Sequence, residues 1–169
     1  MLLKLGNDMG LDIWVAKNDR NREAGGQKFT DLPRLKKEIP LTFDEATNRT
    51  IQLIDVLVLK GNQIKAAFEI ESTTSIYSGI LRLADLIAMQ PHINMPLYLV
   101  APDDRREKVI TEVNRPVFSK LSPPMSEICS FIPFSALHRH ISQLGAYVQY
   151  LNPDFLDKLS ESCEIEGEE

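Results

Sequence analysis

Two apolar segments separated by a glycine-containing turn constrain the fold of this chain most strongly. Ile51–Leu59 reads I-Q-L-I-D-V-L-V-L, and Ile64–Glu71 reads I-K-A-A-F-E-I-E. The intervening Lys60-Gly61-Asn62 supplies a turn, so the two segments predict a β-hairpin. The first segment is apolar on both faces, which is typical of a central strand covered by helices.

The hydrophobic pattern on either side of the hairpin predicts alternating helices and strands. We expect a helix that ends near Gly10, helices over residues 31–39, 76–89, 103–115 and 134–151, and strands over residues 11–16, 97–101 and 128–134, the last near a sheet edge. The order α-β-(α)-β-β-α-β-α-β-α indicates an α/β domain, with a mixed central sheet flanked by helices.

Length and composition are those of a single globular domain. The chain has 169 residues, of which 43% are hydrophobic and 25% charged. No apolar run approaches the roughly 18 residues that span a bilayer, and the N-terminus is too weakly apolar for a secretory signal. We therefore expect a cytoplasmic protein with no membrane partner. The two cysteines, Cys129 and Cys163, do not predict a disulfide scaffold or a zinc knuckle.

The net charge of −5 is concentrated at the C-terminal end. Residues 152–169 hold seven acids and one base and so carry −6, which leaves +1 for residues 1–151. The sequence therefore predicts a domain over residues 1–151 and an acidic, flexible tail over residues 152–169. A nearly neutral domain can bind DNA where its basic residues cluster.

Three carboxylates mark the predicted hairpin. Asp55 lies within the first strand, and Glu69 and Glu71 end the second, two residues apart and thus on one face. Burying unpaired carboxylates costs several kcal/mol each, on the order of the desolvation penalty of a buried ion. A divalent cation would compensate this cost, and hard oxygen ligands suit Mg²⁺ or Mn²⁺.

A shared site places a condition on the hairpin register. A two-residue Gly61-Asn62 loop pairs Lys60 with Gln63, which by itself would put Asp55 and Glu69 on opposite faces. The hypothesis therefore requires a three-residue loop or one β-bulge between the two motifs.

The pattern Ile54-Asp55, thirteen intervening residues and then Glu69-Ile70-Glu71 resembles the PD-(D/E)XK signature of restriction-endonuclease-like nucleases. The stretch F-E-I-E-S-T-T-S-I-Y-S-G-I-L-R-L-A-D-L is also similar to a family of uncharacterised bacterial restriction-like domains. This resemblance, over roughly residues 2–151, implies an αβββαβ core and a Mg²⁺-dependent DNA endonuclease of a restriction or defence system. It implies Asp55, Glu69 and the Ile70 carbonyl as metal ligands.

The sequence departs from this signature at two positions. Ile54 replaces the proline, and Glu71 replaces the lysine that helps to position water. We assign Glu71 as an outer ligand or as the group that orients or deprotonates water. Two alternatives remain open because the lysine is missing: a catalytically silent nucleic-acid-binding domain, and a protein-interaction module that uses the acidic tail.

Candidate DNA contacts surround the acidic motif. Arg82 follows on the predicted helix, where it contacts a phosphate, pairs with a site carboxylate, or pairs within its own helix with Asp85 or Ser78. The remaining candidates are hydroxyl groups that either bind phosphate oxygens or only cap the helix, and basic residues that form a rim or a solvated surface: Ser72, Thr73, Ser75, Tyr77, Arg105 and Arg106. The expected partners are DNA, a second copy of the chain for double-strand cleavage, and a restriction-system partner.

Overall fold

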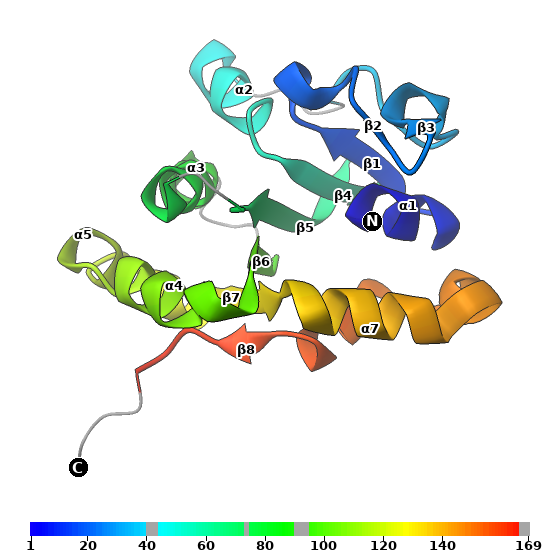
Figure 1. Cartoon of the computed structure of the whole chain (residues 1–169). Helices are drawn as coiled ribbons and strands as arrows, with labels where there is room; N and C mark the ends of the chain where they lie inside the picture. Colours follow the sequence, from blue (N-terminus) through cyan, green and yellow to red (C-terminus); the bar gives the residue numbers. More distant parts are fainter. Residues whose placement is uncertain (40–43, 73–74, 90–94, 166–169) are drawn as a thin grey trace.

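The computed structural model describes residues 1–39, 44–72, 75–89 and 95–165 (Figure 1). A six-stranded mixed sheet forms its centre, in the order β1-β4-β5-β6-β7-β8. These strands are β1 (Asp12–Val15), β4 (Val56–Lys60), β5 (Gln63–Ile70), β6 (Leu97–Ala101), β7 (Cys129–Pro133) and β8 (Glu161–Ser162). β5, β6 and β7 run parallel to one another, whereas the β1/β4, β4/β5 and β7/β8 pairs are antiparallel. A separate two-stranded ribbon joins β2 (Glu23–Ala24) to β3 (Gln27–Lys28).

Helices cover both faces of the sheet (Figure 1). One face packs against α2 (Glu45–Ile51), α3 (Ile76–Met89), α4 (Arg106–Val113), α5 (Pro116–Ser119) and α6 (Met125–Ile128). The other face packs against α1 (Leu2–Asp8), α7 (Phe134–Leu144) and the 3-10 helices η4 (Gly145–Tyr150) and η5 (Pro153–Lys158). The described residues also form the 3-10 helices η1 (Lys17–Asp19), η2 (Phe29–Asp31) and η3 (Asp103–Arg105). This is the predicted mixed α/β class, and its order is compatible with a restriction-endonuclease-like fold.

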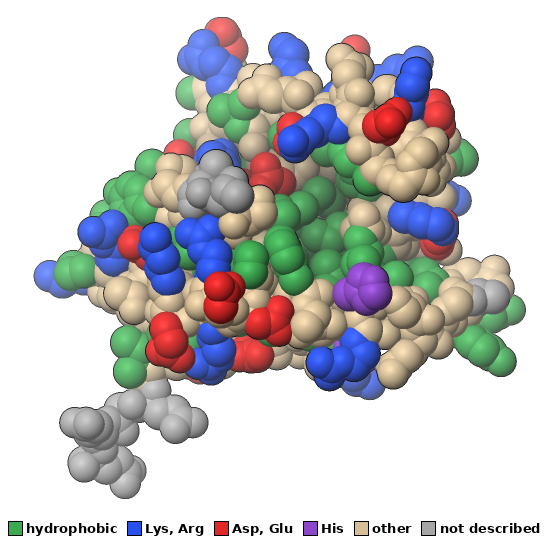
Figure 2. Space-filling view, in the orientation of Figure 1, with side chains coloured by type: hydrophobic (Ala, Val, Ile, Leu, Met, Phe, Trp, Pro, Cys, Tyr) green, Lys and Arg blue, Asp and Glu red, His purple; other side chains and the backbone are tan. Residues whose placement is uncertain are grey.

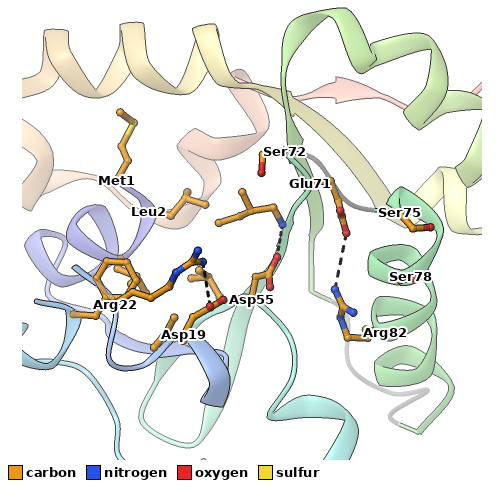
Figure 3. Close-up of a pocket in the computed structure, with 15 residues that line it drawn as sticks. Met1, Leu2, Asp19, Arg22, Asp55, Glu71, Ser72, Ser75, Ser78 and Arg82 are labelled. Carbon is orange, nitrogen blue, oxygen red and sulfur yellow. Dashed lines mark hydrogen bonds and ion pairs between the residues drawn. The ribbon is translucent and has the colours of Figure 1, made fainter. Parts of the chain in front are cut away.

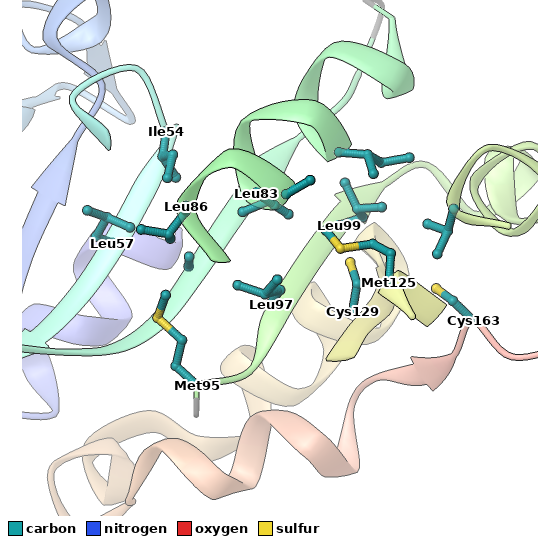
Figure 4. Packing of buried hydrophobic residues seen from close by; sticks show 14 of the residues in the cluster. Ile54, Leu57, Leu83, Leu86, Met95, Leu97, Leu99, Met125, Cys129 and Cys163 are labelled. Carbon is teal, nitrogen blue, oxygen red and sulfur yellow. The ribbon is translucent and has the colours of Figure 1, made fainter. Parts of the chain in front are cut away.

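Two hydrophobic layers hold the sheet between its helices. Alternate strand residues point to opposite faces, so that Leu57 joins the layer under α3 while Val56 joins the layer under α1 and α7. The layer under α3 continues through Leu83 and Leu99 as far as Cys163 (Figure 4). No described helix is long and apolar enough to cross a membrane.

The hairpin between β4 and β5 satisfies the register condition through a bulge. Lys60 pairs with Gln63 across a two-residue turn, in which Gly61 has a φ of 62°. The register then shifts between Leu59 and Val58, because Lys65 is an extra residue in β5. Ile64 consequently packs in the layer under α3 and Ala66 in the opposite layer, although they are two residues apart.

Two predictions were wrong: the helix over residues 31–39, and the start of the first hairpin strand at Ile51. Residues 32–39 do not form a helix; Ile13 N–H donates to the Arg34 carbonyl and Lys36 N–H to the Ile13 carbonyl, so this segment lies extended along β1. The first hairpin strand begins only at Val56, because Ile51 ends helix α2. Asp44 caps that helix by accepting a hydrogen bond from Thr47 N–H at 2.9 Å.

The C-terminal segment differs from the expected flexible tail. β8 pairs with β7, so β7 is not at the sheet edge, and the helix from Phe134 ends at Leu144, before Gly145. Residues 153–163 pack on the domain through the buried Leu156 and Cys163. Two of the tail's acids have internal partners. Asp157 accepts a hydrogen bond from the Tyr98 hydroxyl at 2.6 Å, and Glu161 pairs with Arg106 at 2.5 Å. Residues 166–169 lie outside the described residues.

Candidate active site at the ends of β4 and β5

Asp55 lies directly before β4, at the end of the sheet where β5 finishes. Its Oδ2 atom accepts a hydrogen bond from Ile70 N–H at 2.7 Å. Val56 pairs with Phe68, so continuing the same register places Asp55 opposite Glu69. The bulge therefore brings the two predicted carboxylates together on one face, which confirms the register that the shared site requires.

Glu69 and Glu71 are buried and contact a guanidinium from helix α3. The exposed fraction is 0% for Glu69 and 2% for Glu71. Arg82 donates to both carboxylate oxygens of Glu69, from Nε at 2.9 Å and from Nη2 at 2.5 Å. The same Nη2 lies 3.9 Å from Glu71 Oε1. Of the alternatives for Arg82, the structure shows the ion pair with the acidic motif.

Gly79 permits helix α3 to approach these carboxylates. A Cβ atom at this position would lie 2.6 Å from Glu71 Oε1 and 3.1 Å from Glu69 Cβ. Both distances are closer than ordinary packing allows, so the glycine is needed for the contact between α3 and the end of β5. The acidic site therefore requires a residue without a side chain at position 79 of the following helix, in addition to its carboxylates.

Burial raises the pKa of both opposed carboxylates, Asp55 and Glu69. Desolvation raises the pKa of Glu69 to about 8; the hydrogen bond from Arg82 lowers it, and the charge of Asp55 adds to the rise. Desolvation also raises the pKa of Asp55, while hydrogen bonds from Ile70 N–H and with Glu69 lower it. The hydrogen bond to Glu69 raises the pKa of Arg82, so the guanidinium stays charged. Carboxylates whose pKa is raised by burial beside a charged partner are typical of functional sites.

A cleft of about 710 Å³ opens over this end of the sheet. Figure 2 shows that this side of the molecule is hollowed, with hydrophobic side chains inside the hollow and charged side chains around it. Asp55, Glu71 and Arg82 line the cleft (Figure 3). Its walls also contain residues that the sequence did not single out as a group: Met1, Leu2, Asp19, Arg22 and Ser78.

The structure separates the candidate DNA contacts into three groups. Ser72 and Ser75 are exposed and line the cleft together with Arg82. Arg105 lies beside the site, where its Nη1 donates to the Glu71 backbone carbonyl at 3.2 Å. The other candidates are placed elsewhere: Tyr77 packs on Phe118 and under Arg115, and Arg106 pairs with Glu161 and Glu107. Thr73 lies outside the described residues.

The helical spacing of Ser78 relative to Ser75 and Arg82 could have identified it in the sequence as a cleft-lining residue. Ser75, Ser78 and Arg82 follow each other at intervals of three and four residues, which places them along one side of a helix. Arg22 has no comparable signal, because it reaches the cleft from the loop after η1. It forms an ion pair with Asp19 at 3.1 Å.

The donor groups are of the chemical kind that a magnesium ion prefers. Asp55 and Glu69 carry carboxylate oxygens, and Ile70, whose N–H donates to Asp55, carries a backbone carbonyl between Glu69 and Glu71. In the present arrangement Arg82 holds both oxygens of Glu69. Within the part of the chain that the structure describes, no three His, Cys, Asp or Glu side chains are grouped to hold a metal ion.

Comparison with known proteins gives the family. A family model described as the type II restriction enzyme NmeDI C-terminal domain matches residues 1–163. The type II restriction enzyme NmeDI of Neisseria meningitidis serogroup C is 28% identical over 171 residues, covering 96% of this chain and 47% of that enzyme. The chain thus spans about half the length of this relative, and no solved structure matches it significantly. The chain belongs to the family of NmeDI C-terminal domains.

Proposed function

We propose that this domain is the nuclease part of a type II restriction enzyme, a Mg²⁺-dependent DNA endonuclease of the PD-(D/E)XK type. One observation carries the proposal: a β-bulge sets Asp55 opposite Glu69 at a cleft, although the turn alone would put them on opposite faces. The similarity to an enzyme named as a type II restriction enzyme supports the same function. DNA is then the substrate.

Asp55, Glu69 and the Ile70 carbonyl are the proposed metal ligands. A magnesium ion held by them would polarise the scissile phosphate, lower the pKa of an attacking water and stabilise the leaving oxygen. Glu71 follows Ile70 at the edge of the cleft, where its carboxylate orients or deprotonates water. Mn²⁺ has the same preference for oxygen ligands and can replace Mg²⁺ in an assay.

The cleft walls formed by α3 and by the serines just before it bind the DNA backbone in this proposal. Ser72, Ser75 and Ser78 are exposed and offer hydroxyl donors to phosphate oxygens. Arg105 follows β6 beside the site and provides positive charge for the phosphate backbone. Cutting both strands of a duplex with one small site requires a second copy of the chain, so we propose a homodimer during cleavage.

Nicking of supercoiled plasmid DNA tests this function. The protein should convert supercoiled into open-circular DNA only with Mg²⁺ or Mn²⁺, and Asp55→Ala should lose at least about 100-fold in rate, since it removes a metal ligand. Asp12→Ala is the matched control, because Asp12 is a strand carboxylate outside the cleft, paired with Lys36 at 3.1 Å. Equal nicking by wild type and Asp55→Ala would refute the proposal.

A catalytically silent DNA-binding domain is the second candidate. Glu71 in the position of the motif lysine and the engagement of Glu69 by Arg82 favour it. This candidate predicts salt-sensitive DNA binding that is the same with and without Mg²⁺, and no nicking under any condition. A protein-interaction module based on the tail has less support, because Asp157 and Glu161 already have partners within the domain.

A further inference from the structure

The Arg82 guanidinium contacts two carboxylates at the end of β5, and a third carboxylate lies just before β4. Glu69 and Glu71 are almost fully buried, and Asp55 lies opposite Glu69. Burying carboxylates without a cation costs several kcal/mol each, so a positive charge at this point stabilises the fold. Arg82 supplies it through ion pairs at 2.5 Å and 3.9 Å. The guanidinium therefore serves as the counter-ion where the proposed function requires a divalent cation.

Arg82 can also reach the cleft. Its side chain is 29% exposed, whereas that of Glu69 is completely buried. It follows Ser75 and Ser78 along the side of α3 that lines the cleft. A guanidinium fork matches a phosphate as well as it matches a carboxylate, so a phosphate bound beside these serines would compete with Glu69 for Arg82.

We propose that Arg82 is a latch on the acidic site, a positioning residue that holds Glu69 until a DNA phosphate in the cleft takes over the guanidinium. Release of Glu69 then frees both its oxygens for a divalent cation. The inference rests on the proposed function and adds an order of events to it. Because binding coupling is reciprocal, DNA strengthens cation binding by the same factor by which the cation strengthens DNA binding.

Mn²⁺ binding to the protein alone tests the latch, with free Mn²⁺ measured by electron paramagnetic resonance. Arg82→Gln removes the competitor and should bind Mn²⁺ about 10-fold more tightly than wild type, within the usual range of coupling between sites. Arg82→Lys separates a latch from simple charge repulsion. Lysine keeps the charge but cannot hold Glu69 through two parallel hydrogen bonds, so this variant should also bind Mn²⁺ more tightly than wild type.

Arg49→Gln is the matched control. Arg49 lies on α2 and pairs with Glu45 at 3.0 Å, so its replacement removes the same charge without touching the cleft. The Mn²⁺ affinity of this variant should equal that of wild type. Circular dichroism verifies that each variant is folded. If Arg82→Gln does not fold, Arg82→Lys still tests the latch, because lysine keeps a positive charge beside the carboxylates.

A second measurement follows the DNA. Binding of a labelled duplex is measured by fluorescence anisotropy with and without Ca²⁺, and the factor gained from Ca²⁺ should be larger in wild type than in Arg82→Lys. Mn²⁺ affinity unchanged in Arg82→Lys would overturn the latch, whatever Arg82→Gln shows. The proposed function is judged separately, since wild-type nicking can persist without a latch and the Mn²⁺ affinities can be read without nicking.

Discussion

Asp55 and Glu69 lie opposite each other at the ends of neighbouring strands because a β-bulge absorbs the one residue by which β5 exceeds its partner. The two-residue turn at Gly61 would give a register in which the two side chains point to opposite faces. Lys65 is the extra residue, and it moves the register by one position before the site is reached. The acidic site therefore depends on where the hairpin absorbs this extra residue as well as on its carboxylates.

Deletion of Lys65 should leave this site intact. Leu59 would still pair with Ile64 and Val58 with Ala66, so the ladder loses its bulge but keeps its partners. We expect the free energy of unfolding in urea to change by less than about 1 kcal/mol and metal-dependent nicking to persist, since the core residues keep their faces.

Deletion of Ala66 is the matched control for that experiment. It also removes one residue, but Lys65 must then occupy the fully buried position of Ala66. An unpaired lysine there should cost several kcal/mol, on the order of the effective penalty for a buried ion. Equal stability of the two deletion variants would contradict the assigned register.

Gly79→Ala should weaken the contact between α3 and β5. The added methyl group meets Glu71 Oε1 and Glu69 Cβ at short distances, and both residues are buried with little room to move. Overpacking of this kind costs about 1–3 kcal/mol, measured as the loss in unfolding free energy. Ser78→Ala, an exposed change on the same helix, should stay within about 0.5 kcal/mol of wild type. A stable Gly79→Ala protein would mean that α3 lies farther from the sheet.

Stability should fall as the pH rises through the titration of Glu69. Burial raises the pKa of Glu69 to about 8 in the folded chain, from an ordinary value of 4.5. The folded state then binds more protons than the unfolded state between these two values, so the free energy of unfolding decreases from about pH 4.5 to about pH 8. Urea unfolding across this range should give a smaller decrease for Glu69→Gln than for wild type. An unchanged slope in that variant would mean that burial does not raise the pKa of Glu69.

The hairpin and the helix after it could be predicted from local sequence. Their signals are the apolar alternation, a glycine in the turn and the helical spacing of Ile76, Ile80 and Leu83, and the same residues are buried in the structure. The condition on the register could also be stated in advance, because it follows from strand geometry. The position of the bulge could not, since nothing in the sequence around Lys65 distinguishes it from its neighbours.

Elements that depend on distant partners were harder to predict. Residues 32–39 have helical spacing, but the hydrogen bonds between Ile13 and the 34–36 segment form with a strand far away in sequence. Ile51 and Ile54 are as buried and apolar as strand residues, which obscured the end of α2. The partner of Arg82 was left open for the same reason: only the fold brings it to Glu69.

Truncation should show where the domain ends. A chain that stops after Leu151 loses β8, the buried Leu156, Leu159 and Cys163, and the acceptor of the Tyr98 hydroxyl. We expect its unfolding free energy to fall by at least about 3 kcal/mol, since each buried apolar side chain contributes roughly 1.5–3 kcal/mol. A chain that stops after Ile165 keeps all these contacts and should match the full chain. If both truncations were equally stable, residues 153–163 would not be part of the domain.

The location of a bound Mn²⁺ ion tests the central claim most directly. Crystals of the protein grown or soaked with Mn²⁺ and a short DNA duplex give its position from anomalous scattering. We predict a peak within about 2.3 Å of carboxylate oxygens from both Asp55 and Glu69, the distance of direct coordination by a small divalent cation. An ion bound elsewhere, or Glu69 still paired with Arg82 beside a bound ion, would contradict a shared metal site.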